Sequence, residues 1–202
     1  MKPDGTLQTF IDDVESVVAT TDDEHEITKR VAERLSALLA GGYRLPPEVT
    51  RPSNEHHVNY PLHIAPGSSW SLAAVVWNAG QRTPVHGHET WGVAGIYSGA
   101  EREFRYVKPT AAESGKPLTP AGEHVWERGQ VTVCCTTDDD VHAVVPVGDA
   151  PTVGIHVYGA DIGTIERQSY DPATGTVRRF VSGWDAPPAG GGHPQPSRSS
   201  DG

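Results

Sequence analysis

The spacing of apolar residues changes along this chain from a helical period to the period of a β-strand. Within the first 42 residues, apolar side chains recur every three or four positions, as they do on one face of an amphipathic helix. A polar break at 20–23 divides the pattern, and Gly41-Gly42 would end it. We therefore expect two helices, whose apolar faces carry Leu7, Phe10, Ile11, Val14, Val17 and Val18 in the first and Ile27, Val31, Leu35, Leu38 and Leu39 in the second.

From about Tyr60 onward the period falls to two, in short segments separated by Gly, Pro, Asp and Asn. Many short strands at such spacing are typical of a sandwich or a barrel, and the jelly roll of the cupins is one of the options. Residues 109–123 have the composition of a loop, and the Pro/Gly/Ser-rich stretch 186–202 has that of a disordered tail. Strands are expected at 70–78, 91–98, 103–107, 130–136, 142–147, 152–158 and 176–181.

Length and composition favour a single, mainly β domain. A chain of 202 residues is long enough for one full core, and its 17 Pro and 22 Gly indicate many turns. We expect the domain to span residues 1–185, with a helical segment at 1–42 and a β-barrel at 60–185. The formal net charge of −10 argues against nucleic acid and against an anionic membrane surface as partners.

The sequence shows neither a membrane anchor nor a secretion signal. It lacks an apolar run of the roughly 18 residues that a transmembrane helix needs. Its first residues, Met1-Lys2-Pro3-Asp4-Gly5, do not form the apolar stretch of a signal peptide. We therefore expect a cytoplasmic protein, and these patterns leave its oligomeric state open.

Candidate chemistry is concentrated in the segment Pro84-Val85-His86-Gly87-His88. Residues two apart on a strand point to the same side, so His86 and His88 are expected to project into one interior. His142 stands in another expected strand and is the candidate for a third ligand. Imidazole binds Zn, Cu, Fe and Ni, so the ligands alone do not choose the metal. The alternative is a pair of strand histidines satisfied by hydrogen bonds.

The spacing around these histidines resembles the first metal motif of the cupins. Gly80 is followed by five residues and then by His86 and His88, as in that motif. The glutamate that cupins place shortly afterwards is replaced by Gly92 or Val93. The resemblance therefore implies a cupin (double-stranded β-helix) barrel with three neutral imidazole ligands. Such ligands would leave a divalent ion its full charge and about three open positions.

Other polar residues receive a simpler interpretation. The acidic run at 138–140 is expected to be a solvated turn before the strand of His142, and no second metal site is expected there. Cys134 and Cys135 would face opposite sides of a strand as small packing residues. Trp77 and Trp91 are also expected to pack in the barrel. No role is assigned to the remaining histidines outside this region: His25, His56, His57, His124 and His193.

Three segments together resemble the thiol dioxygenases, the family of cysteine dioxygenase and 3-mercaptopropionate dioxygenase. The segment 77–93, which reads WNAGQRTPVHGHETWGV, is similar to the family's metal motif. Asp140-Val141-His142 is similar to its third-ligand strand, and the segment 154–163 to its Ser-x-His-x-Tyr segment. The resemblance covers about residues 60–185.

This resemblance implies a non-haem Fe(II) enzyme that uses O2 to oxidise a small thiol carboxylate to its sulfinate. Fe(II) would be held by His86, His88 and His142, and no organic cofactor would be needed. Tyr158 would contact the substrate or the reacting oxygen, and His156 would orient it. The family's serine is replaced by Gly154, which breaks the usual chain of hydrogen bonds.

The resemblance also bears on the substrate. Arg167 stands where bacterial 3-mercaptopropionate-type enzymes carry an arginine for the substrate carboxylate. Its alternative is a surface arginine paired with Glu166 or an aspartate. The stretch 59–64 lacks the arginine of the animal cysteine dioxygenases, which favours 3-mercaptopropionate over cysteine. Two other functions remain open: a cupin metalloenzyme acting on a non-thiol substrate, and a non-catalytic cupin that binds a metal or a small acid.

Overall fold

A computed structural model describes residues 4–110, 115–138 and 140–187. Two helices, α1 (Gly5–Val18) and α2 (Glu24–Ala40), come first, and strands dominate the rest of the chain. Two short 3-10 turns, η1 (Pro47–Thr50) and η2 (Pro66–Ser68), flank the first strand. The strands are β1 (Val58–Ile64), β2 (Ser71–Trp77), β3 (Val85–His86), β4 (Gly92–Ser98), β5 (Ala100–Tyr106), β6 (Pro120–Glu127), β7 (Val131–Cys134), β8 (Val141–Pro146), β9 (Thr152–Tyr158), β10 (Arg167–Tyr170) and β11 (Val177–Phe180).

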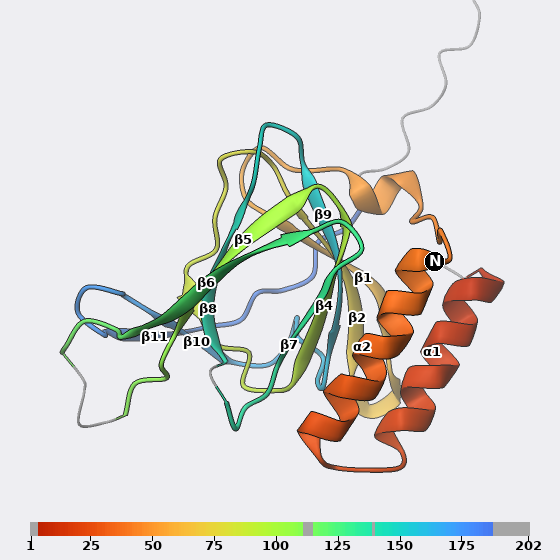
Figure 1. Ribbon diagram of the computed structural model, residues 1–202, viewed down its shortest axis with the longest axis horizontal. Helices are drawn as coiled ribbons and strands as arrows, with labels where there is room; N and C mark the ends of the chain where they lie inside the picture. The colour runs from red at the N-terminus through yellow and green to blue at the C-terminus, as the bar shows by residue number, and fades with distance from the viewer. Residues whose placement is uncertain (1–3, 111–114, 139, 188–202) are drawn as a thin grey trace, which may run out of the picture.

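The strands form two antiparallel sheets that face each other as a barrel (Figure 1). One sheet has the order β1-β2-β9-β4-β7, and the other has the order β11-β10-β3-β8-β5-β6. Neighbours in each sheet come from distant parts of the chain: β2 pairs with β9, and β3 pairs with both β8 and β10. This mainly β architecture with two preceding helices is the cupin (double-stranded β-helix) fold, as the sequence predicts.

The main hydrophobic core lies outside the barrel, between the helices and the five-stranded sheet. Alternate residues of β2 and β9, such as Leu72 and Ile155, belong to the same buried cluster as Val31 and Leu35 of α2. The backbones approach closely at Gly95 of β4, where a Cβ would lie 2.8 Å from Leu39 Cδ1 and 2.9 Å from Leu35 Cδ2. Because the helices bury the outer face of this sheet, its inner face is free to line a site.

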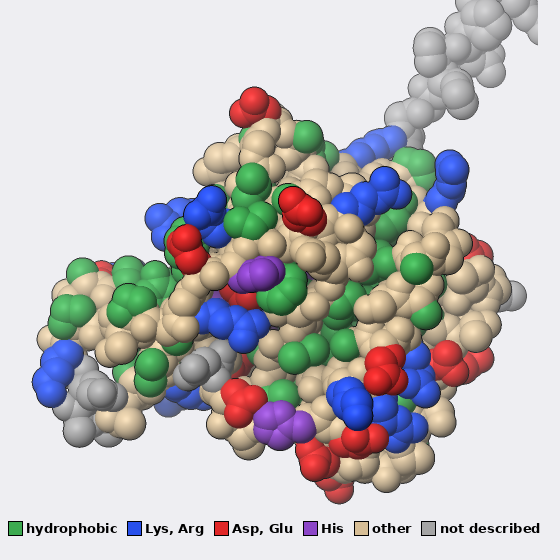
Figure 2. All heavy atoms as spheres, in the orientation of Figure 1, with side chains coloured by type: hydrophobic (Ala, Val, Ile, Leu, Met, Phe, Trp, Pro, Cys, Tyr) green, Lys and Arg blue, Asp and Glu red, His purple; other side chains and the backbone are tan. Residues whose placement is uncertain are grey.

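The solvent side of the helices carries mixed charge. Figure 2 shows basic and acidic side chains interspersed over this part of the surface, and Arg30 lies 4.0 Å from Glu26 one turn away. Both helices begin at an aspartate: Asp4 accepts a hydrogen bond from Leu7 N, and Asp23 accepts hydrogen bonds from His25 N and Glu26 N. The apolar residues that the sequence pattern assigned to one face of each helix are the ones that pack in the core.

Three strands (β1, β6 and β10) escape the sequence prediction, and the strand expected to carry both His86 and His88 ends at His86. The expected loop 109–123 is wrong at its end, because residues 120–123 belong to β6. This strand lies at the edge of its sheet and is mostly exposed, so it has no apolar alternation to reveal it. β3 and β10 are very short, and the strand β1 contains a proline and a register shift.

The chain after β11 returns to the barrel. Asp185 N donates to Asn59 O at 3.0 Å, and Trp184 Nε1 donates to Asp161 Oδ1 at 2.8 Å. These bonds hold residues 182–185 against the barrel near its cavity. Of the expected disordered tail, residues 188–202 lie outside the described part of the chain. The single-domain boundaries at 1–185 stay a prediction. Neither of the described helices is long and apolar enough to cross a membrane.

Candidate metal centre

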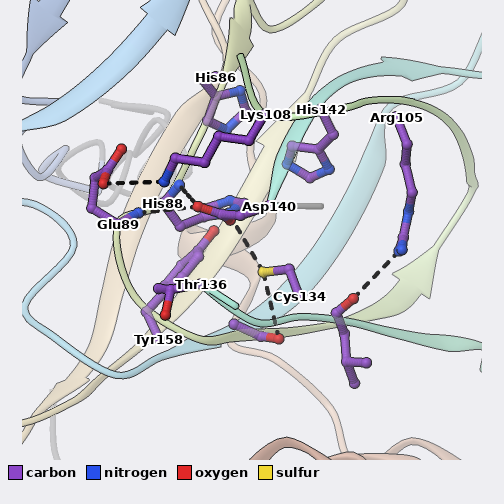
Figure 3. A network of polar contacts seen from close by, with 12 residues as sticks. His86, His88, Glu89, Arg105, Lys108, Cys134, Thr136, Asp140, His142 and Tyr158 are labelled. Atoms are coloured by element: carbon purple, nitrogen blue, oxygen red, sulfur yellow. Dashed lines mark hydrogen bonds and ion pairs between the residues drawn. The ribbon is translucent and has the colours of Figure 1, made fainter. Parts of the chain in front are cut away.

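The structure brings the three predicted metal ligands together inside the barrel. His86 ends β3, His88 follows it, and His142 on β8 is the direct register partner of His86. One ring nitrogen from each histidine lies within 4.8 Å of the others. The three ring centroids are 4.9–5.1 Å apart, and Figure 3 shows the imidazoles around a common space.

Each imidazole is held from behind through its Nδ1 atom. His86 Nδ1 lies 3.0 Å from Pro84 O, His88 Nδ1 lies 2.7 Å from Asp140 Oδ1, and His142 Nδ1 lies 2.7 Å from Glu103 Oε1. Because these partners are hydrogen-bond acceptors, they favour the tautomer with the proton on Nδ1. Nε2 is then left as the bare nitrogen on each ring, which is the form that binds a transition metal.

Asp140 corrects the expectation of a solvated acidic turn at 138–140. Its side chain is fully buried, and it accepts hydrogen bonds from His88 Nδ1, from His88 N at 2.8 Å and from Glu89 N at 3.2 Å. Burial acts to raise the pKa of Asp140, but the hydrogen bonds from His88 and Glu89 hold it below its usual value. The ionised carboxylate fixes His88, which lies beyond the end of β3 and has no strand to place it.

Glu103 plays the corresponding part for His142, and the sequence analysis gave it no role. Its carboxylate also accepts from Trp126 Nε1 at 2.8 Å and lies 3.2 Å from Arg105 Nε. Burial opposes ionisation, but the contacts with His142, Arg105 and Trp126 prevail and lower the pKa of Glu103 to about 2. Two anions therefore stand behind the three rings. They would balance much of the charge that neutral ligands alone would leave on the ion.

The protonation state of the ligands also suits a metal. Burial, together with the neighbouring histidines, lowers the pKa of His86 well below its usual value. Burial lowers the pKa of His88 in spite of the carboxylate beside it. Both rings are thus neutral near pH 7, as a metal ligand must be. The donor set and its supporting acceptors fit a transition metal.

The imidazoles open onto a cavity of about 60 Å³ between the two sheets. Its walls include Trp77, Glu101, Cys134, His156, Tyr158 and Arg167. Among the described residues, four of these wall residues have a buried polar atom without a hydrogen-bond partner: Trp77 Nε1, Glu101 Oε2, His156 Nε2 and Arg167 Nε. Buried polar groups without partners are costly, and all four of these side chains belong to the wall of one cavity, so its lining is polar as well as apolar.

His156 and Tyr158 both point inward from β9 and contact each other. The Tyr158 hydroxyl lies 2.8 Å from His156 Nδ1. A Cβ at Gly154 would collide with His156 Nε2, so the imidazole occupies the space that a serine would need. Burial lowers the pKa of His156 to about 3 and raises that of Tyr158, so both groups are neutral. The pair therefore keeps its own hydrogen bond without the serine.

Arg167 lies at the start of β10 and is only 6% exposed. Its guanidinium carbon stands 4.6 Å from the centre of the Phe180 ring, which fixes the plane of the group. The surface alternative is wrong, because Glu166 pairs instead with Arg179 at 2.8 Å. The carboxylate-binding role predicted for Arg167 is thus compatible with its place in the cavity wall.

The two cysteines face opposite sides, as predicted. Cys134 Sγ lies 3.5 Å from His88 Nδ1 in the cavity wall, whereas Cys135 Sγ lies 3.6 Å from Thr28 Oγ1 of α2. A Cβ at Gly92 would lie 2.8 Å from Cys134 Sγ, so the thiol fills the space beside this glycine. Cys134 is therefore part of the site, which the interpretation as simple packing missed.

Other wall residues were also missed. His57, which was given no role, lines the cavity and stacks on Trp77 with ring centroids 6.2 Å apart. Glu101 and Glu103 stand two apart on β5, so the pleat points both inward. Charged residues at alternate positions of a strand could have revealed this pair. The contribution of Asp140 had no such signal, because neighbouring aspartates look alike in sequence.

No family model matches this chain. Among solved structures it is similar to an uncharacterized protein with a double-stranded β-helix domain from Klebsiella pneumoniae, at 14% identity over 68% of this chain and 96% of that one, with a TM-score of 0.43. A Cupin 2 conserved barrel domain protein from Salinispora arenicola matches at 15% identity over 57% and 85%, with a TM-score of 0.40. An oxalate oxidase in complex with the substrate analogue glycolate matches at 16% identity over 64% and 61%, with a TM-score of 0.43. Likeness at this level assigns no activity.

Removal of the carboxylate behind His88 is expected to weaken metal binding. Asp140→Asn should lower the affinity for a divalent transition metal about 10- to 100-fold, because the amide holds the ring less firmly and lowers its basicity. Competition with a chromogenic chelator measures this affinity. Glu89→Gln is the matched control, since its carboxylate pairs with Lys108 at 3.5 Å. Equal affinities in the two variants would contradict the role of Asp140.

The buried Glu101 is expected to make the metal-free protein less stable as the pH rises. Burial, followed by the charge of Glu103, raises the pKa of Glu101 from 4.5 to about 8. The native state then holds a proton that the unfolded chain releases, so Glu101 contributes a fall in stability of up to about 1.4 kcal/mol per pH unit between about pH 5 and pH 8, opposite in sign to the contribution of the buried histidines. In urea unfolding, the stability of Glu101→Gln should rise with pH relative to that of the unchanged protein, whereas the exposed control Glu127→Gln should follow the unchanged protein. The same slope in both variants would contradict the assignment.

Proposed function

We propose that this protein is a non-haem Fe(II) dioxygenase that converts a small thiol carboxylate, of the 3-mercaptopropionate type, into its sulfinate with O2. One observation supports this above all. Three imidazoles and a buried arginine without a partner for its Nε share the wall of one cavity. A ligand with a soft donor at one end and a carboxylate at the other would satisfy both.

The metal would be held by His86, His88 and His142. When bound, Fe(II) would supply adjacent open positions for the thiolate and O2 and so hold the reactants close together. Imidazoles also accept other metals, and the choice of iron comes from the resemblance to the thiol dioxygenases. The carboxylates of Asp140 and Glu103 would keep the three rings oriented throughout.

Arg167 would bind the substrate carboxylate. Its planar group is pressed against Phe180, and its buried Nε–H has no partner of its own. Guanidinium–carboxylate hydrogen bonds are strong because both partners are charged. The substrate would then be tethered at the end opposite to its sulfur, with the thiol directed toward the three imidazoles.

Tyr158 would act as a hydrogen-bond donor within the cavity. With the proton on His156 Nδ1, that nitrogen donates to the tyrosine oxygen over 2.8 Å. The hydroxyl proton of Tyr158 is then available to the substrate or to a reacting oxygen. Because burial raises the pKa of Tyr158, the hydroxyl keeps its proton near pH 7. His156 is accordingly a positioning residue.

The size and lining of the cavity also favour a small acid. A water-sized group needs about 10–15 Å³, so this cavity holds about four to six of them. Val75, Val93 and Val144 contribute apolar walls that would keep bulk water from the reacting atoms.

A panel of thiols under O2 tests the activity directly. Protein loaded with iron under anaerobic conditions should consume one O2 per sulfinate formed with 3-mercaptopropionate. Cysteamine, which lacks the carboxylate, and propionate, which lacks the thiol, should give little or no uptake. Bound iron without uptake on any thiol would exclude the activity and favour a non-thiol substrate or a binding function.

The role of Arg167 is tested separately. Arg167→Gln should raise KM for 3-mercaptopropionate roughly 30-fold, because a charge-assisted hydrogen bond worth about 2 kcal/mol is lost. The KM for cysteamine, if any turnover is detected, should not change. Arg179→Gln removes an arginine from the neighbouring exposed ion pair with Glu166 and should behave as the unchanged protein. An unaltered KM in Arg167→Gln would contradict carboxylate binding there.

A further inference from the structure

A second group of metal-binding side chains lies outside the barrel, where α2 begins beside the loop that joins β7 to β8. It consists of His25, Cys135 and Asp138, and one ligand atom from each lies within 4.8 Å of the others. His25 and Asp138 are exposed to solvent, and Cys135 is buried beneath them. We propose that these three residues bind a second divalent transition metal ion, Zn²⁺ in particular.

The distances are close to those that a zinc ion imposes. His25 Nδ1 lies 3.7 Å from Cys135 Sγ and 3.7 Å from Asp138 Oδ2. With Zn–N near 2.0–2.1 Å and Zn–S near 2.3 Å, two ligand atoms of a tetrahedral site stand about 3.3–3.6 Å apart. The two distances from His25 therefore exceed the expected range by only a few tenths of an ångström, and Cys135 Sγ lies within 4.8 Å of an Asp138 carboxylate oxygen. Water would take the fourth position on the open side.

The ligand types also select the metal. A thiolate and an imidazole favour zinc and its neighbours in the transition series over Mg²⁺ and Ca²⁺, which prefer oxygen ligands. On binding, the thiol proton of Cys135 passes to solvent. One Zn²⁺ with one thiolate and one carboxylate is then neutral overall. It therefore places no net positive charge at the N-terminus of α2, where the helix dipole would disfavour it.

The loop and the helix are already tied together without a metal. The Glu24 carboxylate in the first turn of α2 accepts hydrogen bonds from Thr136 N at 2.6 Å and from Thr136 Oγ1 at 2.9 Å. Asp138 N donates to Cys135 O at 3.1 Å, which closes the turn between the two loop ligands. The entropy cost of bringing the ligands together is thus largely met by the fold.

The histidine of this group is also held by a hydrogen bond on the side away from the proposed ion, but through Nε2, whereas the barrel histidines are held through Nδ1. Thr137 Oγ1 lies 3.3 Å from His25 Nε2, on the side of the ring away from Cys135. A proton on Nε2 donated to this hydroxyl leaves Nδ1 bare, and Nδ1 is the atom that faces Cys135 and Asp138. An outward hydrogen bond of this kind is usual for a metal-ligating histidine.

The position of the site gives it a connection to the barrel. Asp140 N donates to Asp138 O at 3.0 Å, and the Asp140 side chain holds His88. An ion at His25, Cys135 and Asp138 would restrain the same turn that supports the ligand in the barrel. The proposal does not depend on the reaction proposed for the barrel site.

Metal titration of the chelator-treated full chain tests the proposal. With Co²⁺ as the probe, the unchanged protein should bind two equivalents and develop the absorption of a thiolate-to-cobalt charge transfer. Cys135→Ser should bind one equivalent and lose this absorption. Cys134→Ser tests the other thiol, which lies 3.5 Å from His88 Nδ1 in the barrel, as a source of the absorption; the absorption should persist in this variant. Zn²⁺ should displace the second Co²⁺ equivalent.

Because Cys135 is buried, its substitution could disturb folding, so a second variant changes the exposed ligand His25 instead. His25→Ala should weaken the second equivalent by more than the roughly 10- to 100-fold that is typical of losing a supporting hydrogen bond, with the first equivalent unchanged. His124→Ala, a histidine on the exposed strand β6, should bind both equivalents. No thiolate-to-cobalt absorption in the unchanged protein, or absorption lost in Cys134→Ser but kept in Cys135→Ser, would overturn the proposal.

Discussion

The hydrogen bonds that join His88 to Asp140 and His142 to Glu103 are the interactions on which the centre of this molecule depends. Three imidazoles within one small space have no reason to stay oriented, because neutral rings neither attract nor align one another strongly. The two buried carboxylates, at 2.7 Å from their rings, supply the direction. Their negative charge lies behind the rings, on the side away from the cavity. It would help to balance the charge of a bound ion although no carboxylate is itself a ligand.

The layers of the fold make room for this arrangement. β2 and β9 are buried on both faces, with one face against the helices and the other toward the barrel. Since the helices and the outer face of the sheet provide the large apolar core, the interior of the barrel need not be filled with apolar side chains. It can carry histidines, acids and an arginine at a cost in stability that the outer core offsets.

The same loop serves two groups of potential ligands. Cys134 at the end of β7 faces the cavity, Cys135 and Asp138 in the loop after it face α2, and Asp140 turns back to His88. Adjacent residues of an extended chain point to opposite sides, so a short segment can present ligands to both. A backbone hydrogen bond from Asp140 N to Asp138 O joins the two sides of the turn.

The sequence by itself determined the helices, the strands with clear apolar alternation and the spacing that brings His86, His88 and His142 into one barrel. Those features depend on the spacing of neighbouring residues, which can be read directly from the sequence. The edge strand β6, the role of Asp140 and the inward direction of Glu103 were decided by tertiary structure. A carboxylate receives its role from the ring it meets, and Asp140 meets a partner 52 residues away. The burial of Asp140 depends on how distant segments pack, so it cannot be predicted from the acidic run 138–140 alone.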